Sequence, residues 1–169
     1  MMRILVAFTF VAACSSAPPD APAAAAESAV THRVLRTGAY AAAANAEPGT
    51  ARAARVFVAR SHDAYAALWR EHIGDAPLPP VDFARETAVF LLLGQRSTGG
   101  WSVAEPGALA VRGSEVEVTA AIGRPAPGGI ATMAFSAPFA VIAVGAPGLE
   151  RAVWNDRDGA RVASSAETP

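Results

Sequence analysis

The chain of 169 residues predicts a single α+β domain: a mostly antiparallel β-sheet, as a sandwich or open barrel-like layer, with one short amphipathic helix. Three observations predict this class. Short apolar segments alternate with turns rich in glycine and proline, one segment has apolar residues at helical spacing, and one run is apolar throughout. No internal repeat interrupts this pattern, so we expect one domain.

The predicted helix follows Ser61, a residue type that caps helix N-termini, and Asp63 in the first turn favours the helix dipole. Its inward face is expected to hold Tyr65, Leu68, Trp69 and His72. Gly74 is expected to end the helix, and prolines at 77, 79 and 80 keep the chain from resuming it.

Nine further segments, separated by turn residues, indicate strands. We predict them at Val30–Arg36, Arg55–Arg60, Thr87–Leu93, Val103–Arg112, Glu115–Ile122, Ile130–Phe135, Phe139–Val144, Leu149–Trp154 and Ala160–Val162. The run Thr87–Leu93 is almost wholly apolar, as expected of a central strand buried on both faces. Hairpin turns are predicted at Gly113-Ser114 and Asp158-Gly159, and Pro138 is expected to separate two strands.

The N-terminal segment is expected to direct export. Arg3 precedes a short apolar run, Ile4–Ala13, that is too short to span a bilayer and is typical of a secretory signal peptide. Its end, Val-Ala-Ala-Cys, resembles a bacterial lipobox, which implies cleavage before Cys14 and attachment of diacylglycerol to that cysteine. The serine that follows implies sorting to the outer membrane. The alternative is a plain signal peptide in which the cysteine is incidental.

The remaining organisation follows from composition. Residues 1–13 are expected to be the signal peptide, 14–29 a flexible tether rich in alanine, proline and serine, 30–162 the folded domain, and 163–169 a disordered tail. With a single cysteine the chain can form no internal disulfide, so its stability must come from a hydrophobic core. A net charge of −1 argues against nucleic acid as a partner.

Catalytic patterns are incomplete in this sequence. Ser102 lies in a near match to the G-x-S-x-G nucleophile elbow, but a strand follows it where an elbow needs a helix. The segment Asn155–Gly159 resembles a calcium loop but lacks oxygen ligands at the first and twelfth positions, so a hairpin turn is expected. Glu115 and Glu117 are explained as the solvent face of a strand. We therefore predict no enzyme, no cofactor and no metal.

The loop between two predicted strands carries the residues that point to function. This loop, called the GG loop below, consists of Gln95, Arg96, Ser97, Thr98, Gly99, Gly100 and Trp101. Gly99 and Gly100 can take positive φ and reverse the chain, which needs no ligand. Arginine and tryptophan are the side chains that dominate protein–protein hot spots, so the GG loop is a candidate protein-binding site. The alternatives are that Arg96 pairs internally, with Asp82, and that Trp101 belongs to the core.

Four segments in order resemble the C-terminal domain family of PrcB, an accessory lipoprotein of a secreted protease complex. They are AALW (66–69), PPVDF (79–83), FLLLGQRSTGGWSV (90–103) and PAPGGIATMAFSAPFAVIAV (125–144). The resemblance covers about residues 30–144. Ser97 stands where the family usually has proline, and Trp101 where it usually has tyrosine.

The resemblance implies a non-catalytic, lipid-anchored protein that binds and stabilises or matures an exported protease or another envelope protein. Two alternatives remain open. The segment Thr98–Trp101 is also distantly similar to the loop that chagasin-like inhibitors insert into cysteine proteases, and the chain could be a structural lipoprotein of the cell envelope. We expect a bacterial cell-envelope location, with the lipid as the membrane link.

Overall fold

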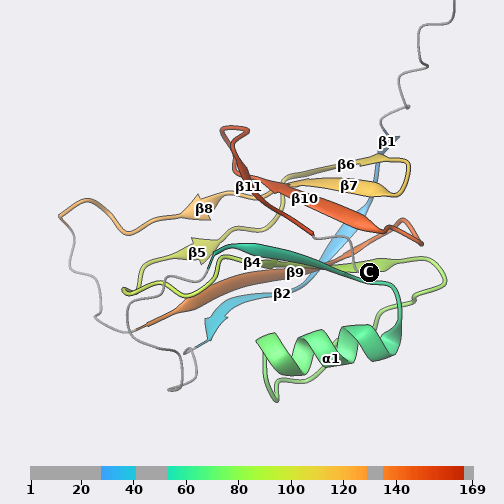
Figure 1. Cartoon of the computed structure of the whole chain (residues 1–169), viewed down its shortest axis with the longest axis horizontal. Helices are drawn as coiled ribbons and strands as arrows, with labels where there is room; N and C mark the ends of the chain where they lie inside the picture. Colours follow the sequence, from blue (N-terminus) through green and yellow to red (C-terminus); the bar gives the residue numbers. More distant parts are fainter. Residues whose placement is uncertain (1–27, 41–52, 129–134, 166–169) are drawn as a thin grey trace, which may run out of the picture.

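The computed structural model describes residues 28–40, 53–128 and 135–165 of the chain. Within these ranges two β-sheets stack on each other and one helix lies against the outer face of one sheet, which gives three layers (Figure 1). This arrangement confirms the α+β class and the mostly antiparallel sheet. The sheets form a sandwich and not a closed barrel.

The middle layer is a four-stranded antiparallel sheet. Its strands lie in the order β2 (His32–Tyr40), β9 (Ala137–Val144), β4 (Thr87–Leu92) and β3 (Arg55–Ala59). The two inner strands, β4 and β9, are buried along their whole length. The run at β4 was predicted to be a central strand on its apolar composition alone, and this is confirmed.

The second sheet has five strands. They lie in the order β1 (Ser28–Ala29), β6 (Ala108–Arg112), β7 (Glu115–Thr119), β10 (Arg151–Asn155) and β11 (Arg161–Ser164). Every pair in it is antiparallel except β7 and β10, which run parallel. A separate two-stranded ribbon, β5 (Ser102–Val103) with β8 (Ile122–Gly123), lies at one side of the sandwich (Figure 1).

Two apolar clusters hold the three layers together, and β4 contributes to both because its side chains alternate between its faces. Val89, Leu91 and Leu93 pack between the two sheets, where they meet Val116, Val118 and Trp154 of the second sheet. Ala88, Phe90 and Leu92 pack on the opposite face, against Tyr65 and Trp69 of the helix.

The helix α1 (His62–His72) starts where the sequence predicted. The Ser61 side chain accepts a hydrogen bond from the Ala64 backbone N–H at 3.3 Å, which confirms its capping role. Gly74 follows the helix end with φ of 87°, a conformation that favours glycine. No described helix is long and apolar enough to cross a membrane.

Three strand boundaries differ from the sequence prediction. The predicted strand Val30–Arg36 corresponds to β2, which runs on to Tyr40, four residues beyond the predicted end. The predicted strand Val103–Arg112 is divided, because Pro106 and Gly107 separate β5 from β6. The predicted strand Glu115–Ile122 is also divided, into β7 and β8, with Ala120 and Ala121 between them.

Pro138 lies inside β9, so the prediction that it separates two strands is wrong. Proline has no N–H to donate, but it still offers a carbonyl, and the Leu93 N–H donates to the Pro138 carbonyl at 2.9 Å. The position near the strand start tolerates the missing donor. Of the predicted strand at 130–135, only Phe135 is described; the signal peptide and most of the predicted tether lie outside the described residues.

The last predicted hairpin is confirmed, with strands at β10 and β11 and a turn at Asp156–Ala160. The Asp156 N–H donates to the Ala160 carbonyl at 2.8 Å, and Gly159 has φ of 84°. The Asp156 carboxylate accepts hydrogen bonds from the Arg157 and Ile122 backbone N–H groups, which hold its pKa below the ordinary value. The segment that resembled a calcium loop is therefore a hairpin turn.

Candidate functional site

The GG loop begins where β4 ends, and it stays bonded to the start of β9. Gly94 turns the chain with φ of 78°. Arg96 and Ser136 then form an isolated antiparallel bridge, in which the Arg96 N–H donates to the Ser136 carbonyl at 2.7 Å and the Ser136 N–H donates back at 3.0 Å. The loop is thus hydrogen-bonded to the residue that directly precedes β9, one of the two inner strands of the middle sheet.

The Arg96 side chain is bound within the loop. Its guanidinium donates to the Leu93 carbonyl at 2.8 Å and lies 5.1 Å from the centre of the Trp101 ring, a cation–π distance. The alternative that Arg96 pairs with Asp82 is wrong, because the ion-pair partner described for that carboxylate is Arg85, at 3.8 Å. Partial burial lowers the pKa of Arg96, although an arginine stays charged at neutral pH.

Two polar atoms of the loop are buried without a hydrogen-bond partner among the described residues. They are Oε1 of Gln95, a residue only 5% exposed, and Nε of Arg96. Such groups are rare in folded proteins and unfavourable by about 1–3 kcal/mol each. The structure therefore places Gln95 inside the domain, where its side chain cannot contact a partner directly.

The reversal at the glycine pair depends on Gly100. Only this glycine of the pair has positive φ, at 84°, and a Cβ built on it would lie 3.1 Å from the Pro125 Cβ. The Ser136 hydroxyl donates to the Thr98 carbonyl at 3.1 Å, which fixes the loop on its other side. Ser97 and Gly100 are the exposed residues of the GG loop.

Trp101 packs against the core between the sheets but keeps part of its surface in solvent. Trp101 therefore contributes to the core, as the alternative reading of the sequence predicted. It also makes the cation–π contact with Arg96.

Phe135, which the sequence analysis assigned to a strand, is one of two exposed large hydrophobic residues in the described chain, at 43%. It immediately precedes Ser136, so it lies beside Ser97 across the bridge. No local sequence pattern indicates that the Phe135 side chain is exposed or that it lies beside the GG loop.

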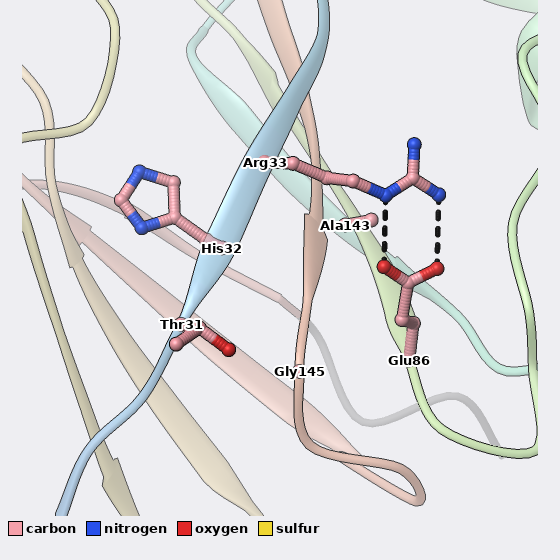
Figure 2. Close-up of a pocket in the computed structure, with 6 residues that line it drawn as sticks. All are labelled: Thr31, His32, Arg33, Glu86, Ala143 and Gly145. Atoms are coloured by element: carbon pink, nitrogen blue, oxygen red, sulfur yellow. Dashed lines mark hydrogen bonds and ion pairs between the residues drawn. The ribbon is translucent and has the colours of Figure 1, made fainter.

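A shallow pocket of about 140 Å³ lies at the opposite end of the middle sheet (Figure 2). Arg33 and Glu86 line it side by side: the guanidinium Nε donates to Oε1 at 2.8 Å and Nη2 donates to Oε2 at 2.9 Å. The same Nη2 donates to the Pro80 carbonyl at 2.6 Å. Hydrogen bonds from Arg33 lower the pKa of Glu86. The two charged groups of the pocket therefore neutralise each other within the chain.

The residues considered above for catalysis or metal binding do not come together in one site, and most of them have structural roles. Ser102 is in strand β5, so the strand–serine–helix elbow does not form. His72 stacks on Phe57, with ring centres 5.1 Å apart, whereas His62 is exposed at the helix start. Glu115 and Glu117 alternate with buried valines, as predicted for a solvent face. In the described ranges no three His, Cys, Asp or Glu side chains gather as a metal site.

Fold and site together define a small two-sheet domain whose distinctive surface is a loop hydrogen-bonded to Ser136 at one sheet end, beside an exposed aromatic ring. Residues 87–145 match the family model described as PrcB C-terminal, which confirms the resemblance for this part of the chain. The match covers β4, the GG loop and β9, but not the segments at 66–69 and 79–83. No curated protein and no solved structure matches the chain.

The matched family is an accessory-type domain family and not a known catalytic one. Its description suggests an accessory role associated with a protease complex.

Proposed function

We propose that this protein is a membrane-anchored lipoprotein that binds, and thereby stabilises or matures, an exported protease or another protein of the cell envelope. The match to the PrcB C-terminal family supports the protease-associated role. In this proposal Cys14 carries the lipid, and a Cys14→Ala variant would lose its partition into detergent when envelope proteins are phase-separated.

The docking surface in this proposal is the GG loop together with Phe135. The observation that carries it is the exposed Phe135 ring beside the loop that holds Arg96 and Trp101, because this ring offers apolar area that a partner can bury next to two side chains common in hot spots. The bridge to Ser136 and the Arg96–Trp101 contact hold the loop in one conformation. Binding then loses little conformational entropy, which favours affinity.

A crosslinking pull-down of the full-length protein from its native envelope, with recovered proteins quantified by mass spectrometry, tests this surface. Phe135→Ser should reduce recovery of an exported protease by about tenfold, the scale of a modest hot spot. Leu78→Ser is the matched control, because Leu78 is the other exposed large hydrophobic residue in the described chain. It follows α1 and does not belong to the proposed surface. Equal recovery in Phe135→Ser and wild type would contradict the proposal.

The chagasin-like inhibitor is the second candidate, since it too uses a loop of this kind. It requires a loop that enters the cleft of a protease, whereas Gly100 packs against Pro125 and Thr98 is bonded to Ser136. Inhibition of papain by the purified full-length protein would favour the inhibitor; unchanged papain activity would favour the accessory protein.

A further inference from the structure

Strand β2 is the longest described strand, with nine residues, and it forms an edge of the middle sheet. Its pairing in the described chain is with β9 on one side. An exposed edge strand offers unpaired N–H and C=O groups to any extended segment that approaches, and proteins usually block such edges with charges, bulges or prolines.

The direction of the peptide groups follows from the pairing at Pro138. The Leu93 N–H donates to the Pro138 carbonyl, so the peptide groups of Pro138 point toward β4. Ala39 is the residue of β2 opposite Pro138. Ala39 and Pro138 therefore form a non-hydrogen-bonded antiparallel pair, in which both residues point their peptide groups away from each other. The N–H and C=O of Ala39 thus point outward from the sheet.

Thr37 lies two residues before Ala39 with no register shift between them, so its N–H and C=O also point outward. The stretch Thr37–Ala39 is exposed, and Gly38 within it has no side chain to hinder an approaching backbone. The register shift between Val34 and Arg36 distorts only the first half of the strand. After Arg36 the strand therefore carries no charge, bulge or proline that would block its edge.

Charge indicates what this edge accepts. Arg36 is exposed, and no carboxylate forms an ion pair with it in the described chain, whereas Arg33 is neutralised by Glu86. The strand His32–Tyr40 contains arginines and no acidic residue. Two copies of β2 would bring like charges together, whereas a strand that carries Asp or Glu would place opposite charges side by side.

The edge and the GG loop lie at the same end of the sheet. Tyr40 of β2 pairs with Ala137, and the preceding residue Ser136 pairs with Arg96 on the other side of the same strand. The free edge and the GG loop thus flank the first residues of β9, about two strand spacings (~10 Å) apart. One partner can contact both.

We propose that the β2 edge at Arg36–Ala39 accepts, as an added antiparallel or parallel strand, an extended segment of a partner protein that carries an acidic side chain facing Arg36. This inference rests on the proposed function, since the partner is the protein that the GG loop and Phe135 contact. The backbone of the added strand bonds to the peptide groups of Thr37 and Ala39, and the carboxylate selects the segment.

The first test removes one outward N–H. In Ala39→Pro the lost donor serves no bond inside the sheet, so the melting temperature of the full-length protein should stay within about 2 °C of wild type. Recovery of the partner in the crosslinking pull-down should fall about fivefold, the scale of a lost hydrogen bond in a binding interface. Ala39→Val is the matched control, because it alters the side chain and keeps the N–H.

A second variant leaves the backbone intact. Arg36→Glu should also reduce partner recovery about fivefold, and Arg36→Lys should retain it, because the proposal requires the positive charge. Full recovery in both Ala39→Pro and Arg36→Glu, with recovery lost in Phe135→Ser, would leave the proposed function standing and overturn strand addition. A wild-type protein that recovers no partner would overturn both.

Amide hydrogen exchange separates a foreign strand from a second copy. In the isolated full-length protein the Thr37 and Ala39 amides should exchange rapidly while the inward Gly38 amide is protected. Protection of Thr37 and Ala39 that increases with protein concentration would show pairing between copies and would overturn the acidic partner strand.

Discussion

The two ends of the middle sheet differ in how far the chain satisfies the polar groups of the strand ends and their loops. The helix layer is not part of this contrast: there the buried Tyr65 hydroxyl has no hydrogen-bond partner among the described residues. At the Glu86 end, the Thr87 hydroxyl donates to the Ala146 carbonyl at 2.8 Å, the Gly145 N–H donates to the Thr31 carbonyl at 2.8 Å, and Glu86 binds Arg33 through two hydrogen bonds. At the Phe135 end, two buried polar atoms lack a described partner and an aromatic ring is exposed.

This difference separates stability from recognition. Groups satisfied within the chain gain nothing from a partner, whereas unpaired backbone groups and an exposed ring gain hydrogen bonds and apolar burial when a partner covers them. A functional surface is therefore expected at the Phe135 end, although the pocket shown in Figure 2 lies at the Glu86 end. The following changes test whether the two ends differ in this way.

The largest effect on stability is expected from Gly100→Ala at the Phe135 end. Alanine is strained at φ of 84°, and its Cβ would press on the Pro125 side chain at 3.1 Å. We expect a loss of about 1–3 kcal/mol in the free energy of unfolding, measured by urea denaturation. Gly113→Ala also has positive φ but meets no atom within 4 Å, so it should lose less. Equal losses would show that Pro125 does not restrict the loop.

Thr87→Val tests the Glu86 end. Valine preserves the shape of the fully buried Thr87 side chain but removes the hydroxyl that satisfies the Ala146 carbonyl. The free energy of unfolding should fall by about 1–2 kcal/mol. A stable Thr87→Val variant would mean that this end does not depend on its hydrogen bonds.

The ion pair in the pocket should make a smaller, pH-dependent contribution. The pKa of Glu86 is below its usual value in the fold, so its stabilisation is complete above the unfolded-state pKa near 4.5 and is lost as pH falls through the lower folded-state pKa. Because the Arg33 side chain is 46% exposed, Arg33→Met should lower stability by about 0.5–1 kcal/mol at pH 7. Thermal melts at pH 7 and pH 3 should differ less in Arg33→Met than in wild type.

The smallest change in stability is expected from Gln95→Leu. Oε1 of Gln95 has no described hydrogen bond to lose, so an apolar side chain of similar size should leave the free energy of unfolding unchanged within about 0.5 kcal/mol, or raise it. A loss above about 1.5 kcal/mol would show that the Gln95 amide is satisfied in solution, and the contrast with Thr87→Val would then fail.

Local sequence signals predicted the elements they govern directly. Ser61 marked the helix start through its side chain, and the apolar run of β4 marked a strand buried on both faces. The GG loop was located by its own residues, but the bridge between Arg96 and Ser136 joins segments far apart in the chain and no local pattern encodes it. Phe135 was missed as a surface residue because apolar character predicts burial on average and not at one position.

The errors have the same origin. Gly38 and Ala39 have low strand propensity, so β2 was predicted to end too early, yet pairing with β9 over its full length outweighs that preference. Pro138 was expected to interrupt a strand, but its carbonyl accepts the hydrogen bond that the Leu93 N–H donates from the end of β4. Whether the GG loop binds a partner depends on groups outside this chain, and so it remains a prediction.

The parallel pairing of β10 with β7 has a consequence for folding. The hairpin of β6 and β7 can form early because it joins adjacent segments, but β10 is synthesised only after β9. Until then β7 is a bare edge that carries Val116 and Val118 on its inner face. We expect the last sheet to close late and slowly, since it depends on a long-range contact. Glu115 and Glu117 on the other face of β7 would keep that intermediate from aggregating in the meantime.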